Sequence, residues 1–153
     1  NVMCNLFMAE NENAFIVMKK LMQTIMLGRD ADVIVVDVHG EATSEKNAMG
    51  HFLDGQASLV VGTHTHIPTA DHRILAAGTA YQTDAGMCGN YDSVIGMDKL
   101  AATSRFTGER KGSLSVASGE PSLCGLVVDI NRQSGLAHAI YPFRTGGALS
   151  QTI

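Results

Sequence analysis

The sequence predicts an α/β fold with mixed strands, and three observations support this class. Two short, Val-rich runs at residues 32–38 and 57–61 flank a helical segment, which is the pattern of a strand–helix–strand unit. An amphipathic segment at residues 14–27 precedes this unit. Strand candidates separated by short turns follow it, as in antiparallel hairpins. We therefore expect one domain, residues 1–153, with parallel strands first and hairpins later.

The composition bounds the kinds of partner that the chain can bind. Its 153 residues are 45% hydrophobic, which is enough to bury a core. The net charge is -4 and the 11 Lys and Arg residues are scattered, so we expect no stable binding to a nucleic-acid duplex. Residues 14–27 are interrupted by Lys19 and Lys20 and fall short of the roughly 20 residues that cross a bilayer, so we expect no membrane association.

The three cysteines, Cys4, Cys88 and Cys124, are odd in number and widely spaced, without a CxxC pair. This pattern favours free thiols over a disulfide framework or a thiolate zinc site. Because free thiols are typical of a reducing compartment, the pattern predicts a cytoplasmic protein.

Capping residues and apolar periodicity define the first elements. The opening run, residues 1–8, has the character of a strand. Residues 10–13 supply helix-capping side chains for the helix at 14–27, which Gly28 ends.

A strand–helix–strand unit follows. Its elements are a strand at 32–38, a helix at 45–53 capped by Thr43 or Ser44, and a strand at 57–61. The first strand reads DVIVVDV, which is typical of a strand covered on both faces, and it ends at His39. A right-handed crossover makes the two strands parallel, so their carboxyl ends lie at one edge of the sheet.

The second half of the chain is richer in strand signals. We expect strands at 73–75 and 79–82 around a turn at 76–78, a helix at 97–106, a charged turn at 108–112, and strands at 123–130 and 136–143 around a turn at 131–135. Each pair of strands has the pattern of an antiparallel hairpin.

Three histidines follow the ends of the two parallel strands. His64 and His66 in the segment THTH form an extended i, i+2 pair, which points both imidazoles to one side, about 6 to 7 Å apart along the backbone. His39 ends the other strand, so we expect three imidazoles in the crevice where open α/β sheets bind ligands. Imidazole suits zinc, iron and other transition metals, and manganese accepts mixed nitrogen and oxygen donors. The trio therefore predicts a metal site.

The other polar candidates carry weaker arguments. We expect surface or packing roles for the remaining histidines, His51, His72 and His138. Five nearby acids are able to ligate a metal or hold an imidazole tautomer, although a solvated or capping role is commoner: Asp37, Glu41, Glu45, Asp71 and Asp84. Two alternatives stay open, namely histidines of a polar loop that bond to backbone and an HxH enzyme of another class, such as a cupin-like oxygenase. The strand–helix–strand unit argues against the latter.

Three segments resemble one family. DVHGEATSEK at 37–46, VVGTHTHIPTADHRIL at 60–75 and TDAGMCGNYDSVIGM at 83–97 closely resemble bacterial YmdB-type metallophosphoesterases, calcineurin-like enzymes described as 2',3'-cyclic-nucleotide 2'-phosphodiesterases. The opening NVMCNLFM and the segment 124–147 continue the match, so the resemblance covers nearly the whole chain. It implies part of a four-layer αββα sandwich with mixed sheets.

The resemblance also implies an activity and a ligand set. The implied reaction is hydrolysis of small 2',3'-cyclic nucleotides at a centre of two divalent transition-metal ions, Fe, Mn or Zn. His39 and His64 would bind one metal and His66 the other. No catalytic residue is identified in this chain, because the family's leaving-group acid and remaining ligands belong to N-terminal segments that these residues do not include.

From the same resemblance we expect the chain to be the C-terminal portion of a metallophosphoesterase domain. Such a portion would associate with the N-terminal part or form a homo-oligomer, because it would otherwise expose a sheet edge. The alternative function is a non-catalytic metal-binding or regulatory module.

Overall fold

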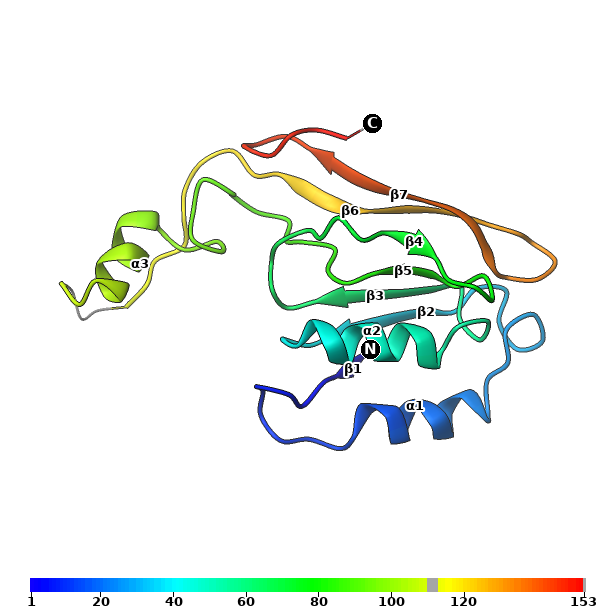
Figure 1. Cartoon of the computed structure of the whole chain (residues 1–153). Helices are drawn as coiled ribbons and strands as arrows, with labels where there is room; N and C mark the ends of the chain where they lie inside the picture. Colours follow the sequence, from blue (N-terminus) through cyan, green and yellow to red (C-terminus); the bar gives the residue numbers. More distant parts are fainter. Residues whose placement is uncertain (110–112, 153) are drawn as a thin grey trace.

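The computed structural model of the protein describes residues 1–109 and 113–152, so residues 110–112 of the expected turn at 108–112 lie outside the described residues. A five-stranded sheet forms its centre (Figure 1). In spatial order the strands are β1 (Val2–Met3), β2 (Val35–His39), β3 (Leu59–Thr63), β5 (Ala80–Gln82) and β4 (Arg73–Ile74). The first four are parallel and β4 is antiparallel to β5. The expected α/β class with mixed strands is confirmed.

Two helices, α1 (Ala14–Met22) and α2 (Thr43–Phe52), cover one face of this sheet (Figure 1). Val36, Val38 and Val60 on that face are buried and belong to the core cluster. The helices add buried side chains to the same cluster, namely Ala14, Met18, Met49 and Leu53. The core therefore lies between the sheet and the two helices, and we call this side the covered face.

The opposite side of β2 and β3 is called the open face here. Side chains alternate along a strand, so Val35, Asp37 and His39 point away from the helices. Val35 is 56% exposed, while Asp37 and His39 are half-buried. The expectation of a strand covered on both faces is therefore wrong for this chain, because the helices pack on one side and no described element buries Val35.

A second, two-stranded sheet is formed by β6 (Leu123–Ile130) and β7 (Ala137–Thr145). The two strands are antiparallel, with a register shift at Asp129 and Ile130. β7 contacts β4 and β5 of the first sheet. Both expected hairpins, β4–β5 and β6–β7, are confirmed.

The first helix is shorter than expected. Asn13 caps α1, since its side chain accepts hydrogen bonds from two backbone N–H groups of the first turn. The helix ends at Met22 rather than at residue 27. Thr24 donates its hydroxyl to the Leu21 carbonyl at 2.8 Å, which satisfies a carbonyl at the helix end.

The other two helices also shift at their starts. α2 begins at Thr43, and its N-cap is Ala42 without a side-chain hydrogen bond, so the expected cap at Thr43 or Ser44 is wrong. α3 (Lys99–Phe106) is capped by Asp98 and lies apart from the sheet (Figure 1). No helix in the described parts of the chain is long and apolar enough to cross a membrane.

Candidate metal centre

The candidate centre lies at the carboxyl ends of β2 and β3. These strands pair in parallel, with His39 opposite Thr63. The chain leaves β3 directly into His64, so the parallel pairing brings together two histidines that are 25 residues apart in sequence. This part of the expected trio lies close together in the structure.

The rings of His39 and His64 meet through one nitrogen each. Nε2 of His39 lies 3.1 Å from Nδ1 of His64. The ring centroids are 4.8 Å apart, and the ring planes cross at 84°. Two ring nitrogens at this distance need a proton or a cation between them, because each otherwise presents a lone pair to the other.

A chain of hydrogen bonds fixes the proton of His39. Thr63 donates its hydroxyl to a carboxylate oxygen of Asp37 at 2.8 Å. Since that hydrogen is used, the Thr63 oxygen accepts from Nδ1–H of His39, at 2.9 Å. Nε2 of neutral His39 is then unprotonated and directed at His64.

Glu41 plays a similar part for His64. Its carboxylate oxygen lies 3.3 Å from Nε2 of His64, which favours the proton on that nitrogen. Without a metal ion, a proton bridges the 3.1 Å contact; when the proton of neutral His64 lies on Nε2 beside Glu41, both facing nitrogens can offer lone pairs to a cation. Such a pair of imidazole donors suits a transition-metal ion, and partners on the far ring nitrogens are typical of metal-binding histidines.

Two imidazoles make only part of a metal site, since a metal ion takes four to six ligands. Within residues 1–109 and 113–152, no group of three or more His, Cys, Asp or Glu side chains lies close enough together to hold a metal ion. The residues present therefore fit a metal ion as a partial ligand set.

His66 lies apart from this pair. Its Nδ1 is 2.9 Å from the carbonyl oxygen of Ile95 and donates to it, because a carbonyl only accepts. Nε2 of neutral His66 is therefore unprotonated. The φ angles of His64 and His66 are 105° and 69°, so the expected extended pair with both rings on one side is wrong. β3 ends at Thr63, and the chain turns before His66.

The turn that carries His64 and His66 is strained, since non-glycine residues at such φ angles cost about 1–3 kcal/mol each. Asp84 holds the residue between them. One of its carboxylate oxygens accepts from the backbone N–H of Thr65 at 3.0 Å and from its hydroxyl at 2.8 Å. Sequence reasoning named Asp84 among five weak candidates and did not find its role.

A buried lysine pairs with Asp84. Nζ of Lys46 lies 2.9 Å from the Asp84 carboxylate, and both side chains are buried. Burial alone would raise the pKa of Asp84, but hydrogen bonds from Lys46, Gly86 and Thr65 outweigh it, so the pKa lies below its ordinary value. The amphipathic pattern offered no signal for Lys46, since lysine is rarely buried unless paired.

The remaining acids and histidines have other surroundings. Glu45 accepts from the backbone N–H groups of Asn5 and Leu6. Asp71 accepts from Thr69 and Thr83. Hydrogen bonds from these threonines outweigh burial, and the pKa of Asp71 is lowered. His51 and His138 are exposed and His72 is half-buried, and all three lie outside the cluster of His39, Thr63 and His64.

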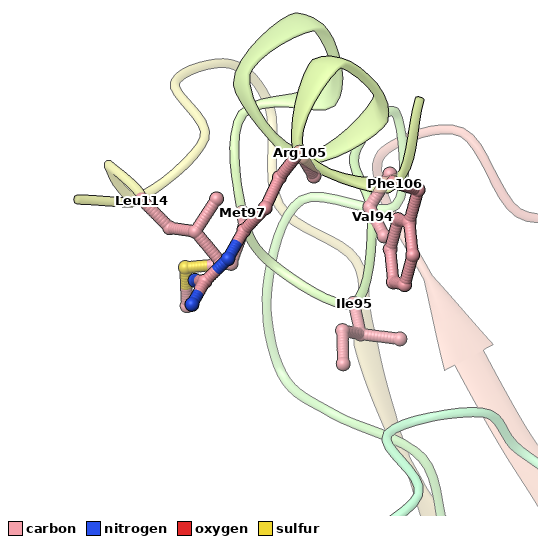
Figure 2. A pocket seen from close by; sticks show the side chains of 7 residues that line it. Val94, Ile95, Met97, Arg105, Phe106 and Leu114 are labelled. Atoms are coloured by element: carbon pink, nitrogen blue, oxygen red, sulfur yellow. The ribbon is translucent and has the colours of Figure 1, made fainter. Parts of the chain in front are cut away.

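An apolar pocket of about 440 Å³ lies under α3 (Figure 2). Ile95, whose carbonyl accepts from His66, lines it. The other described lining residues are Val94, Met97, Ala102, Arg105, Phe106 and Leu114. They include no carboxylate and no imidazole, so the candidate metal ligands His39 and His64 lie outside this pocket.

The sequence is similar to that of a known bacterial enzyme. The chain is 52% identical over 101 residues to the 2',3'-cyclic-nucleotide 2'-phosphodiesterase of Bacillus subtilis (strain 168), and this match covers 66% of the chain and 38% of that protein.

Two solved structures resemble the fold. A hypothetical protein from Thermus thermophilus superposes with a TM-score of 0.86 at 38% identity, covering 96% of this chain and 56% of that one. A novel phosphatase from Mycoplasma pneumoniae superposes with a TM-score of 0.81 at 35% identity, covering 90% of this chain and 48% of that one.

The chain thus spans between 38% and 56% of the length of these proteins. Residues 1–143 match the family of YmdB-like proteins. Since this match takes in both strand ends, the histidine turn and most of the β6–β7 ribbon, the chain belongs to the family of YmdB-like proteins.

Proposed function

We propose that the chain provides histidine ligands to a metal centre that hydrolyses phosphodiesters, with small 2',3'-cyclic nucleotides as substrates. The observation that carries this proposal is the 3.1 Å contact between Nε2 of His39 and Nδ1 of His64. The substrate class is supported by the name of the Bacillus subtilis relative, a 2',3'-cyclic-nucleotide 2'-phosphodiesterase.

The proposed centre holds two divalent transition-metal ions, Fe, Mn or Zn. His39 and His64 bind one through the two facing nitrogens, and His66 binds the other through Nε2. When bound, these ions supply positive charge beside the phosphoryl oxygens and acidify the attacking water.

The protein's own residues keep the ligand nitrogens unprotonated. Thr63, tied to Asp37, holds the proton of His39 on Nδ1. In the metal-bound site the proton of His64 would lie on Nε2, 3.3 Å from the Glu41 carboxylate, and the Ile95 carbonyl accepts from Nδ1–H of His66. Each ring is therefore oriented by a partner on the nitrogen that does not bind metal.

We propose that the other ligands and the acid for the leaving group come from residues outside these 153, with this chain acting as the C-terminal portion of the catalytic domain. The open face supports this arrangement, because Val35 is 56% exposed there and can take a further layer of structure. The extent of the relatives supports it too, since the match covers 38% of the Bacillus subtilis protein.

The metal content of the purified chain tests the proposal. Elemental mass spectrometry on protein prepared without chelator should find sub-stoichiometric transition metal, which His64→Ala removes. His138→Ala is the matched control, because His138 is exposed on β7, and it should keep the metal. Equal metal in all three proteins would contradict the proposal.

A non-catalytic metal-binding module is the second candidate. It is favoured by the lack, among the described residues, of a third ligand beside His39 and His64. Hydrolysis of 2',3'-cyclic AMP in the presence of Mn²⁺ by the chain combined with a relative's N-terminal portion would exclude it. Metal binding without hydrolysis in that mixture would favour it.

A further inference from the structure

Lys46 and Asp84 form an ion pair that the interior of the protein encloses. Their side chains are 0% and 1% exposed, and Nζ of Lys46 lies 2.9 Å from the Asp84 carboxylate. Lys46 belongs to α2 and Asp84 follows β5, so the pair joins the helix that packs on the sheet to the segment that follows the neighbour of β3. Charged side chains are rarely buried to this degree, which makes the surroundings of the pair informative.

The other hydrogen bonds of the pair reach the segment that carries the histidines. Lys46 donates to the carbonyl of Thr63 at 2.9 Å, the residue before His64. Asp84 accepts from the N–H and the hydroxyl of Thr65, the residue after it. The ion pair is therefore hydrogen-bonded to the backbone of the residue before His64 and of the residue after it.

The backbone at this point needs an outside restraint. His64 has φ 105° and His66 has φ 69°, a region that side-chain-bearing residues rarely adopt. Such angles persist where the surrounding structure imposes them. Thr65 is the residue between the two strained positions, and Asp84 holds it by two hydrogen bonds.

The fold leaves room for the lysine to reach this place. A Cβ at Gly62 would lie 2.5 Å from Cδ of Lys46 and 1.7 Å from the carbonyl oxygen of Thr83. β3 therefore has glycine where the Lys46 stem crosses it. Apolar side chains at both 46 and 84 would fill the same space without the cost of removing two charges from water.

A buried ion pair is weak evidence for stability, because desolvation offsets most of the attraction. We therefore look for the role of this pair in the backbone conformation that it holds. We propose that Lys46 and Asp84 are positioning residues that fix the Thr63–Thr65 backbone, so that Nδ1 of His64 faces His39 while His66 is held at a second ligand position. This inference rests on the metal site of the proposed function.

Thr65 offers the mildest test. Thr65→Val removes the hydroxyl bond to Asp84 and keeps the shape of the side chain, whereas Thr65→Ser keeps the bond. Co²⁺ is the probe, since its visible absorption at saturation reports how the imidazoles surround it. We expect Thr65→Val to weaken Co²⁺ binding about tenfold and to change the saturated spectrum, and Thr65→Ser to match the wild type.

Asp84→Asn gives the larger perturbation, with Asp71→Asn as its matched control. Asp71 also accepts from two threonine hydroxyls but does not bond to the histidine turn. Circular dichroism and thermal unfolding establish that each variant is folded at the assay temperature. We expect a loss of Co²⁺ affinity of at least about tenfold for folded Asp84→Asn and a change within about twofold for Asp71→Asn. If Asp84→Asn does not fold, the two Thr65 variants decide the question.

The experiments distinguish an error in the positioning role of Lys46 and Asp84 from an error in the proposed metal site. Equal Co²⁺ affinity and equal spectra for Thr65→Val and Thr65→Ser would overturn the positioning role while His64→Ala still lost the metal. Unchanged Co²⁺ binding by His64→Ala would overturn the metal site and the positioning role together.

Discussion

The two faces of the central sheet are built from the same strands but differ in exposure and in chemistry. On the covered face Val38 is 0% exposed, and on the open face Val35, three residues earlier in the same strand, is 56% exposed. The covered face is apolar and packs against α1 and α2. The open face carries Asp37 and His39, and the hydroxyl of Thr63 links these two side chains by hydrogen bonds. One β-strand thus supplies the core with alternate residues and the candidate metal centre with the others.

The comparison also separates what stabilises each face. Apolar burial stabilises the covered face, at roughly 25 cal/mol per Å² of apolar surface removed from water. The candidate centre is organised by polar contacts and contains two strained residues, His64 and His66. Changes on the covered face should therefore affect folding, and changes at the centre should affect metal binding.

The largest expected effect is at Gly62 on the covered face, where an added Cβ would meet the Thr83 carbonyl oxygen at 1.7 Å. We expect Gly62→Ala to lower the free energy of unfolding by more than about 3 kcal/mol, measured by urea denaturation. Gly125→Ala in β6 is the control, because nothing lies within 4 Å of its added Cβ. Similar losses in both variants would show that the close approach at Gly62 is not what matters.

The two valines of β2 test the comparison directly. Val38→Ala should cost about 2–3 kcal/mol in the free energy of unfolding, because it leaves a cavity between β2 and the helices. Val35→Ala should change it by less than about 0.5 kcal/mol, since that side chain is already exposed. Equal costs would mean that the open face is buried in solution, for instance by a second copy of the chain.

Thr63→Val should separate binding from folding at the centre. It removes the hydroxyl that ties His39 to Asp37, at a cost of about 1 kcal/mol or less in the free energy of unfolding. Co²⁺ binding, followed by visible absorption, should weaken about tenfold, since partners of metal ligands have effects of that size. Thr107→Val, at an exposed helix end, serves as the control and should leave both quantities unchanged.

The smallest expected effect is on the dependence of stability on pH. The pKa of Asp84 is lowered in the folded state, so as the pH falls below the ordinary value of about 4 the unfolded state takes up the proton first. The contribution of the ion pair is complete above that pH and is lost as the pH falls through the folded pKa. Urea denaturation between pH 6 and about 3 should show a shallower fall for the Lys46→Met, Asp84→Asn double variant, whereas equal slopes would contradict this contribution.

Much of the covered face was predictable from the sequence. The Val-rich runs and the strand–helix–strand order fix the parallel pairing of β2 and β3, and this pairing brings His39 towards His64. Both hairpins follow from short turns between apolar runs. These features depend on local periodicity and on chain connectivity, which a single sequence contains.

The details of the centre were not predictable. The sequence motif THTH favours an extended pair, but Asp84 bonds Thr65 from 19 residues away and the chain turns. The pairing of Lys46 with Asp84 depends on tertiary packing and has no local pattern. The open face was missed because a strand with both faces apolar has the same pattern whether or not a second layer is present in the chain.

The most direct measurement is anomalous X-ray diffraction from crystals of the chain soaked in Mn²⁺ or Zn²⁺. The account predicts an anomalous peak within about 2.0–2.3 Å of both Nε2 of His39 and Nδ1 of His64, whose 3.1 Å separation suits two neighbouring ligands of one metal ion. No peak at saturating metal, with that contact intact, or a peak bound by other residues alone, would contradict it.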